Sequence, residues 1–229
     1  MFKISTSYRD DWNCYKSLSD ACYELRSSLD LPIEDVRVNT INNLEKITQM
    51  TGMLLNPLIC TEEASTPTTL HVVLKLYGYG NSKGGSEFLQ QTAKYLKLAH
   101  ITAAQFQIEH LIDSLDTEIS GPSKQPGFFQ RAQRLLASLQ LSDPVLDELT
   151  IPARIRNSLH NNGQHRGADF DVTIQGIRYS ASSGDYIDCA TRPHCAHALE
   201  NSVTVIESIL SHPSITKIAF MPRHPKDAK

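Results

Sequence analysis

Apolar side chains recur every third or fourth residue over most of the chain, and this spacing is typical of helices. The first such pattern covers residues 8–29, and a second covers residues 33–50. We expect Gly52 to break the second helix, because glycine weakens a helix interior. A further helical piece over residues 53–63 should then bend at Pro57. The first quarter of the chain is therefore predicted to form helices with short breaks.

The middle of the chain carries the longest helical pattern. It covers residues 87–119 and, at 1.5 Å per residue, would extend for about 50 Å as the backbone of a bundle or a dimer surface. Before it, residues 64–69 should form a loop, whereas the apolar residues 70–77 fit a strand and a helix equally well. The glycine-rich residues 78–86 could cradle a phosphate, but they lack the phosphate-loop spacing, so we favour a hinge.

Two shorter helices are predicted after the stop signal at residues 121–127. The first covers residues 128–141, and four of its side chains should face inward, namely Phe129, Leu135, Leu136 and Leu139. The second covers residues 150–163, where Thr150 can cap the N-terminus and Pro152 is early enough to fit the first turn. The glycine at its end can take the left-handed conformation that terminates a helix.

The spacing changes from helical to alternating in the last third of the chain. Residues 171–174 and 177–180 alternate around Gln175-Gly176, and a second turn follows at residues 182–185, so we predict a hairpin or a three-stranded meander. A last helix is expected over residues 193–210. Two further features are predicted at the end, an added strand at residues 215–221 and a mobile tail at residues 222–229.

Together these elements predict a mainly α protein, a helical bundle with a small β-hairpin or meander inserted near the C-terminal end. We expect a single domain over residues 1–229, which is long enough for a substantial core. The N-terminal helices, including the long one, occupy residues 1–120. The remaining elements occupy residues 121–229.

Charge and cysteine content narrow the class of protein without assigning a function. The net charge is −3 and the pI about 6.3, so nucleic acid would have to bind at a local basic patch. The five cysteines are an odd and sparse set, as expected of reduced thiols in a cytoplasmic protein. No apolar run approaches the roughly 20 residues that span a bilayer, and the N-terminus lacks a signal peptide's apolar core, so we expect no membrane partner.

The candidate chemistry lies in the helix predicted over residues 150–163. Arg156 and His160 are four residues apart and therefore share one face of that helix. Ile155 and Leu159 form the neighbouring apolar stripe. The polar pair should therefore flank the buried seam of the helix, where a partner side chain or a substrate could be held.

The run Arg156-Asn157-Ser158-Leu159-His160 resembles the signature of the HEPN superfamily, in which an arginine and a polar residue precede a histidine. The resemblance implies a dimeric helical bundle and a metal-independent ribonuclease of a bacterial defence or toxin system, with no cofactor. It also implies RNA as the substrate. Three residues separate Arg156 from His160, fewer than the usual four to six, whereas five residues separate Arg154 from His160.

The resemblance gives each residue of the motif a role. His160 would act as acid or base, Arg156 would hold the phosphate, and Asn157 would bind substrate or orient the histidine. Arg154 is retained as a supporting charge, because six residues place it about 120° from His160 around the helix. A two-fold dimer would supply the second histidine for proton transfer. Other side chains that could contact RNA are Lys124, Arg131, Arg134 and His165.

Two other interpretations stay open. The short gap and Asn161, which cannot act as an acid or base, favour a non-catalytic HEPN-like module that binds a nucleotide or a protein such as an antitoxin. Arg156 could instead form an ion pair with Asp147, Glu148 or Asp169. No metal is predicted, because zinc-site spacing is absent from the histidines and cysteines of the last third, His160, His165, Cys189, His194, Cys195 and His197.

Overall fold

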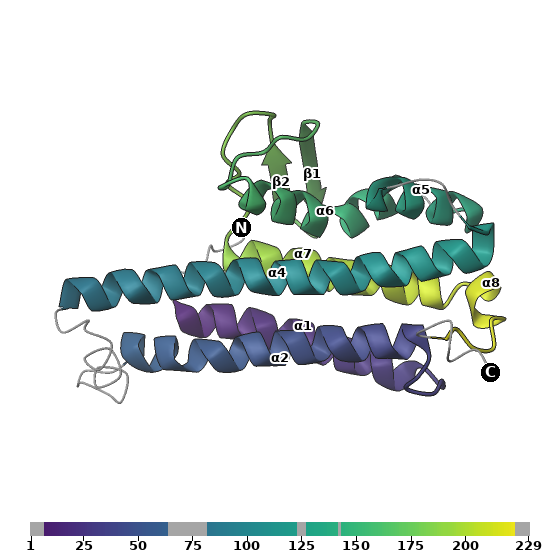
Figure 1. The fold of residues 1–229 in the computed structure, drawn as a ribbon, viewed down its shortest axis with the longest axis horizontal. Helices are drawn as coiled ribbons and strands as arrows, with labels where there is room; N and C mark the ends of the chain where they lie inside the picture. The colour runs from purple at the N-terminus through teal and green to yellow at the C-terminus, as the bar shows by residue number, and fades with distance from the viewer. Residues whose placement is uncertain (1–6, 64–81, 123–126, 142, 223–229) are drawn as a thin grey trace.

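The structure, a computed structural model of the chain, describes residues 7–63, 82–122, 127–141 and 143–222. Over these residues it forms seven helices and one two-stranded antiparallel sheet, which confirms a mainly α protein with a hairpin near the C-terminal end (Figure 1). In chain order the elements are α1 (Tyr8–Ser28), α2 (Val36–Glu63), α4 (Ser82–Ser120), α5 (Phe128–Ser138), α6 (Asp143–His160), β1 (Phe170–Ile174), β2 (Ile177–Ala181), α7 (Arg192–Leu210) and α8 (Pro213–Thr216).

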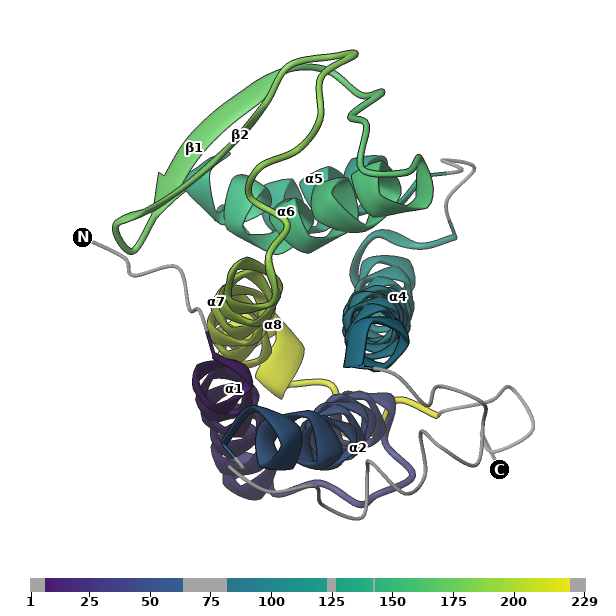
Figure 2. The same ribbon diagram turned by 90° about the vertical axis from the view of Figure 1, so that its left-hand side faces the viewer.

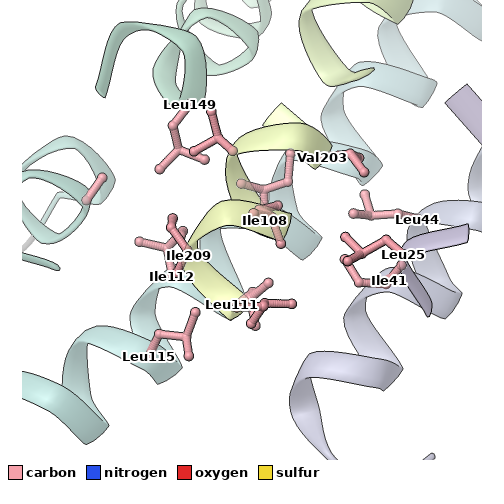
Figure 3. Packing of buried hydrophobic residues seen from close by; sticks show 14 of the residues in the cluster. Leu25, Ile41, Leu44, Ile108, Leu111, Ile112, Leu115, Leu149, Val203 and Ile209 are labelled. Carbon is pink, nitrogen blue, oxygen red and sulfur yellow. The ribbon is translucent and has the colours of Figure 1, made fainter. Parts of the chain in front are cut away.

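The helices pack in three layers, which are most easily seen along the bundle axis (Figure 2). Helices α1 and α2 form one layer and α4 and α7 the next, while α5, α6 and the hairpin lie on the far side of α4 and α7. The main core joins helices from residues 1–120 and 121–229 (Figure 3). Its labelled members include Leu25, Ile41, Leu44, Ile108, Ile112, Leu149, Val203 and Ile209.

Helix α2 is continuous from Val36 to Glu63, so the predicted break at Gly52 is wrong. Gly52 lies against Trp12 of α1, and a Cβ at this position would stand 3.6 Å from two atoms of the indole ring. A glycine in a helix costs about 1 kcal/mol. The packing of α2 against α1 outweighs this cost, so the helix continues.

Helix α4 confirms the predicted long helix but begins earlier, at Ser82, and ends at Ser120. The predicted glycine-rich hinge is therefore wrong in part, because Gly84-Gly85 lies inside the helix. The loop expected at residues 64–69 and the undecided residues 70–77 lie outside the described residues. The same holds for nearly all of the tail predicted at the end of the chain.

Helix α6 begins at Asp143 and contains the whole candidate motif, so the separate helix predicted from Thr150 is wrong. Thr150 is buried within α6, and Pro152 lies in the helix interior. A proline there leaves the carbonyl of Glu148 without its helical N–H donor. The hydroxyl of Ser202 on α7 donates to that carbonyl oxygen at 3.1 Å. This contact explains how the helix continues through residues that resemble a start signal.

Positive φ angles end α6 and form the hairpin turn, as predicted. Gly163 has a φ of +87°, and its N–H donates to the carbonyl of Ser158 at 2.8 Å. Strands β1 and β2 pair around Gln175 and Gly176, whose φ values of +48° and +81° fit a two-residue hairpin turn. The third strand of the alternative meander does not form in the described part of the chain, where Tyr186 makes only an isolated bridge.

The strand predicted at residues 215–221 is wrong, because this segment begins with the end of α8 and leads to a single bridge between Pro222 and Asp35. Asp35 and Arg37 form a buried ion pair, with Nη2 and Oδ2 2.6 Å apart. The pair also binds three backbone groups of the segment, the carbonyls of Ile215 and Ile218 and the N–H of Met221. Burial would raise the pKa of the Asp35 carboxyl, but the hydrogen bonds it accepts from Arg37 and Met221 hold the pKa below its usual value. The side chains of Asp35 and Arg37 thus bind backbone groups that would pair with a neighbouring strand if this segment were in a sheet.

Candidate functional site

The candidate residues surround an open groove on α6. A cavity of about 530 Å³ lies between the end of α6, the start of α5 and the segment 165–168. A second cavity of about 310 Å³ shares the walls Phe129, Arg154 and Asn157 and continues toward α4. We call the two cavities together the α6 groove. The other residues that line its larger cavity are His160, Asn161, His165, Arg166, Gly167 and Ala168.

His160 is the last residue of α6, and its exposed side chain lines the larger cavity. Its Nε2 atom lies 3.1 Å from the hydroxyl oxygen of Thr102 on α4, which fixes the ring in place. The C-terminal end of a helix favours a cation, because unpaired carbonyl groups there carry partial negative charge. Within the described residues Nδ1 has no hydrogen-bond partner, so one ring nitrogen is held and the other can meet a ligand.

Arg156 is held toward α4 and does not line the larger cavity with His160. Its Nη1 atom donates to Oε1 of Glu109 at 2.8 Å, and Nε and Nη2 donate to Oδ1 of Asn157 at 3.1 and 2.9 Å. Glu109 on α4 thus replaces the three acidic partners suggested by the sequence. Three donor groups of this guanidinium are engaged by protein, which makes it a structural link between α6 and α4.

Arg154, predicted only as a supporting charge, lines both cavities together with Asn157. Its guanidinium carbon lies 5.7 Å from the ring centre of Phe129 and 5.2 Å from that of Phe170, within the range of cation–π contacts. Its Nη2 atom also lies 3.5 Å from Oδ1 of Asp147. Two rings and a carboxylate therefore position this guanidinium in the cavity that contains the motif histidine.

Phe129 forms a wall of the groove, and the prediction that it faces the core is wrong. Its side chain is 39% exposed, whereas Leu135, Leu136 and Leu139 are buried as predicted. Ala132 is the first fully buried residue of α5. The apolar face of α5 continues from Phe128, which packs against the core, through Ala132 to Leu136, and Phe129 lies off this face, where it contacts Arg154 and the groove.

Two other side chains predicted to contact RNA, those of Arg131 and Arg134, do not line the groove. Nη1 of Arg131 lies 2.9 Å from Oδ1 of Asp113 on α4. Arg134 donates to both carboxylate oxygens of the buried Asp116, at 2.8 and 2.5 Å, and to the carbonyl of Gly121. These arginines hold α5 against α4. Lys124 lies outside the described residues.

His165 lines the groove but is 4% exposed, and both ring nitrogens have partners. Nδ1 lies 3.0 Å from the hydroxyl oxygen of Ser158, and Nε2 lies 2.9 Å from the carbonyl oxygen of Ala168. Gly167 packs on this ring, since a Cβ there would meet Cε1 at 3.0 Å. His165 therefore anchors the segment 165–168, which presents the exposed Arg166 to the groove. Arg166 is a residue of the site for which the sequence carries no periodic or motif signal.

The other histidines and cysteines weighed as zinc ligands do not line the groove, namely Cys189, His194, Cys195 and His197. Cys195 is buried, and burial raises its pKa to about 12. His197 Nδ1 lies 2.8 Å from the hydroxyl oxygen of Tyr179, and burial lowers the pKa of both His197 and His194. Among the described residues no group of histidine, cysteine or acidic side chains is arranged to hold a metal ion. The cysteines described with their side chains are free thiols, namely Cys14, Cys22, Cys189 and Cys195.

No family model matches this chain, and neither a curated protein nor a solved structure matches it. The resemblance of the motif to HEPN proteins therefore stays a prediction, and the function has to be argued from the groove. In the described part of the chain, none of the helices combines the length and the apolar character needed to cross a bilayer.

Proposed function

We propose that the chain is a metal-independent endoribonuclease that cuts RNA in the α6 groove. The observation that carries the proposal is that Arg154, Asn157 and His160 line one open cavity. In RNA the 2′-hydroxyl oxygen can attack the adjacent phosphorus, forming a new O–P bond while the bond to the 5′-oxygen of the next nucleotide breaks. The products are a 2′,3′-cyclic phosphate and a 5′-hydroxyl.

Each of the three side chains has chemistry suited to this reaction. His160 takes up the proton of the 2′-hydroxyl, because histidine can act as a base near neutral pH and this ring reaches solvent. Arg154 stabilises the negative charge that develops on the phosphate, since a guanidinium is always charged and its planar donors match phosphate oxygens. The amide oxygen of Asn157 accepts from Arg156, which leaves the amide nitrogen to donate to the substrate.

The leaving 5′-oxygen also needs a proton. Among the described residues two histidines line the larger cavity, and His165 is buried with both nitrogens engaged, so His160 is the exposed imidazole of this set. A two-fold dimer that joins two grooves would supply a second copy of His160 as the acid. A homodimer that cuts RNA in the cytoplasm, within a bacterial defence or toxin-type system, is therefore part of the proposal.

The test is incubation of the purified protein with mixed RNA in EDTA. The wild type should release fragments that end in a cyclic phosphate, and His160→Ala should release them at least about 100-fold more slowly. Arg154→Ala should lose about 100-fold in rate, more than Arg156→Ala, because Arg154 lines the cavity with the histidine. The control is His110→Ala, which removes an exposed histidine of α4 and should leave the rate unchanged. Equal cleavage by the wild type and His160→Ala would overturn the proposal.

A non-catalytic binding module is the second candidate, and two observations favour it. Arg156 is engaged by Glu109 and Asn157, and Asn161, which cannot transfer protons, stands in the groove beside His160. Such a module would bind a nucleotide or a protein partner, such as an antitoxin or a defence subunit, in the α6 groove. Absence of cleavage by the wild type, with retained binding that Arg154→Ala weakens, would select this function.

A further inference from the structure

Two exposed phenylalanines lie against arginines that line the α6 groove, and Phe129 lines the groove itself. Phe129 of α5 is 39% exposed, and its ring centre lies 5.7 Å from the guanidinium carbon of Arg154. Phe106 of α4 is 58% exposed, and its ring centre lies 5.7 Å from the guanidinium carbon of Arg156. Both rings lie near positive charge, and both leave apolar surface in contact with water.

The groove and the hairpin beside it carry opposite charge. Three arginines line the groove, Arg154 and Arg166 in the cavity of His160 and Arg156 in the smaller one, against one carboxylate, that of Glu109, which is paired with Arg156. A separate cavity of about 480 Å³ at the hairpin is lined by four carboxylates, those of Asp169, Asp171, Asp185 and Asp188. Its arginine, Arg178, is bonded to Asp171. A phosphate backbone would be repelled from the hairpin and attracted along α6, from segment 165–168 toward α4.

We infer that Phe129 and Phe106 are stacking platforms that select unpaired bases on either side of the cleaved phosphate. The inference rests on the proposed function and deepens it, since it makes single-stranded RNA the substrate. An aromatic ring next to a cation is a typical surface for stacking a base, and only a base released from its helix can offer its face. From Thr150 to His160 the groove follows α6 for about 15 Å, which suits a few nucleotides of an extended strand.

The test measures binding separately from cleavage. The probe is a fluorescent 2′-O-methyl RNA, which lacks the attacking hydroxyl, used as a single strand and as a duplex of the same sequence. The single strand should bind the wild type at least about 10-fold more tightly than the duplex. Phe129→Ala and Phe106→Ala should each weaken binding of the single strand by about 5- to 100-fold. Phe129→Trp, which keeps a stacking face, should bind like the wild type.

Two matched variants separate stacking from general effects. Tyr95→Ala removes an aromatic side chain of α4 that is 68% exposed and does not line the groove, so binding should be unchanged. Phe129→Leu keeps apolar volume near Arg154 but lacks a ring, so it should bind as weakly as Phe129→Ala. Equal affinity for strand and duplex, or full affinity in Phe129→Leu, would overturn the inference.

The inference and the proposed function can fail separately. If the wild type does not cut RNA but binds the single strand through Phe129, the ribonuclease is excluded and the stacking platform stands. If the wild type cuts unmodified single strand and duplex at the same rate and Phe129→Leu cuts normally, the ribonuclease stands and the stacking platform is excluded.

Discussion

Two histidine–threonine pairs connect helix α4 to its neighbours, one in the core and one at the groove. Nε2 of His100, on α4, lies 3.2 Å from the hydroxyl oxygen of Thr48 on α2. Nε2 of His160, on α6, lies 3.1 Å from the hydroxyl oxygen of Thr102 on α4. The hydrogen bond is the same in both pairs, but His100 is 1% exposed whereas His160 is exposed at the groove.

Burial decides what each histidine can do. For His100, burial lowers the pKa to about 4, and its ring packs edge-on against Tyr15 at 4.7 Å. Its Nδ1 atom has no hydrogen-bond partner among the residues that the structure describes. His100 is therefore a neutral component of the core near pH 7. A hydrogen-bonded histidine becomes a candidate for proton transfer only where a substrate can reach it, as at His160.

The largest expected effect separates the two histidines by function. His160→Ala should lower the cleavage rate by roughly 100- to 10,000-fold, which is the usual contribution of a general acid or base. It should hardly change the melting temperature. His100→Ala should destabilise the fold by on the order of 2–4 kcal/mol, because it opens a cavity in the core. The measurements are initial cleavage rates and urea unfolding at pH 7. The comparison fails if His100→Ala, still folded at the assay temperature, loses cleavage as fully as His160→Ala.

The next largest effect is a pH dependence of the free energy of unfolding that is caused by His100. The pKa of about 4 in the folded protein is below the ordinary histidine value of 6.5, so the unfolded chain binds the extra proton first as the pH falls. The contribution of the neutral His100 side chain to stability is fully present above pH 6.5 and is lost as the pH falls toward 4. Between pH 7 and pH 4.5 the resulting loss in the free energy of unfolding should amount to about 2 kcal/mol. Urea titrations should show a shallower loss in His100→Leu than in the wild type, and parallel curves for the two proteins would contradict the assignment.

The smallest effects come from the threonines. Thr48→Val should destabilise the fold by about 1 kcal/mol, since it removes a buried hydrogen bond to His100. Thr102→Val should leave unfolding unchanged and lower the cleavage rate by about 3- to 10-fold, because the His160 ring loses its fixed position. A Thr102→Ser control keeps the hydroxyl and should retain the wild-type rate. A full rate in Thr102→Val would show that this contact does not position the ring.

Local sequence patterns predicted the bounds of a helix or turn correctly where the packing of distant residues did not oppose them. The helical spacing placed α1 and α7 to within one residue at each end, and Gln175-Gly176 marked the hairpin turn. These patterns failed where a distant residue intervened. Trp12 covers Gly52, and Ser202 binds the carbonyl that Pro152 leaves free, so α2 and α6 continue through apparent breaks. Such partners follow from the packing of the helices, which a local pattern does not contain.

At the site, too, the local pattern does not predict which distant residues hold a side chain. The motif located Asn157 and His160, which line one cavity, but helix geometry favoured Arg156 over Arg154. A helical wheel gives the direction of a Cβ atom, whereas a long arginine follows its partners. Glu109, 47 residues away in the chain, holds Arg156, and a ring on each of α5 and β1 contacts Arg154.

The ion pair of Asp35 and Arg37 has a consequence for the order of folding during synthesis. Asp35 is 0% and Arg37 3% exposed, and their remaining hydrogen bonds go to backbone groups between Ile215 and Met221. Until that segment leaves the ribosome, the start of α2 would bury charges whose hydrogen bonds are incomplete, which is costly. The nascent chain should therefore keep the start of α2 open until residue 221 emerges, and a ribosome-bound chain stalled before this point should be cut there by protease.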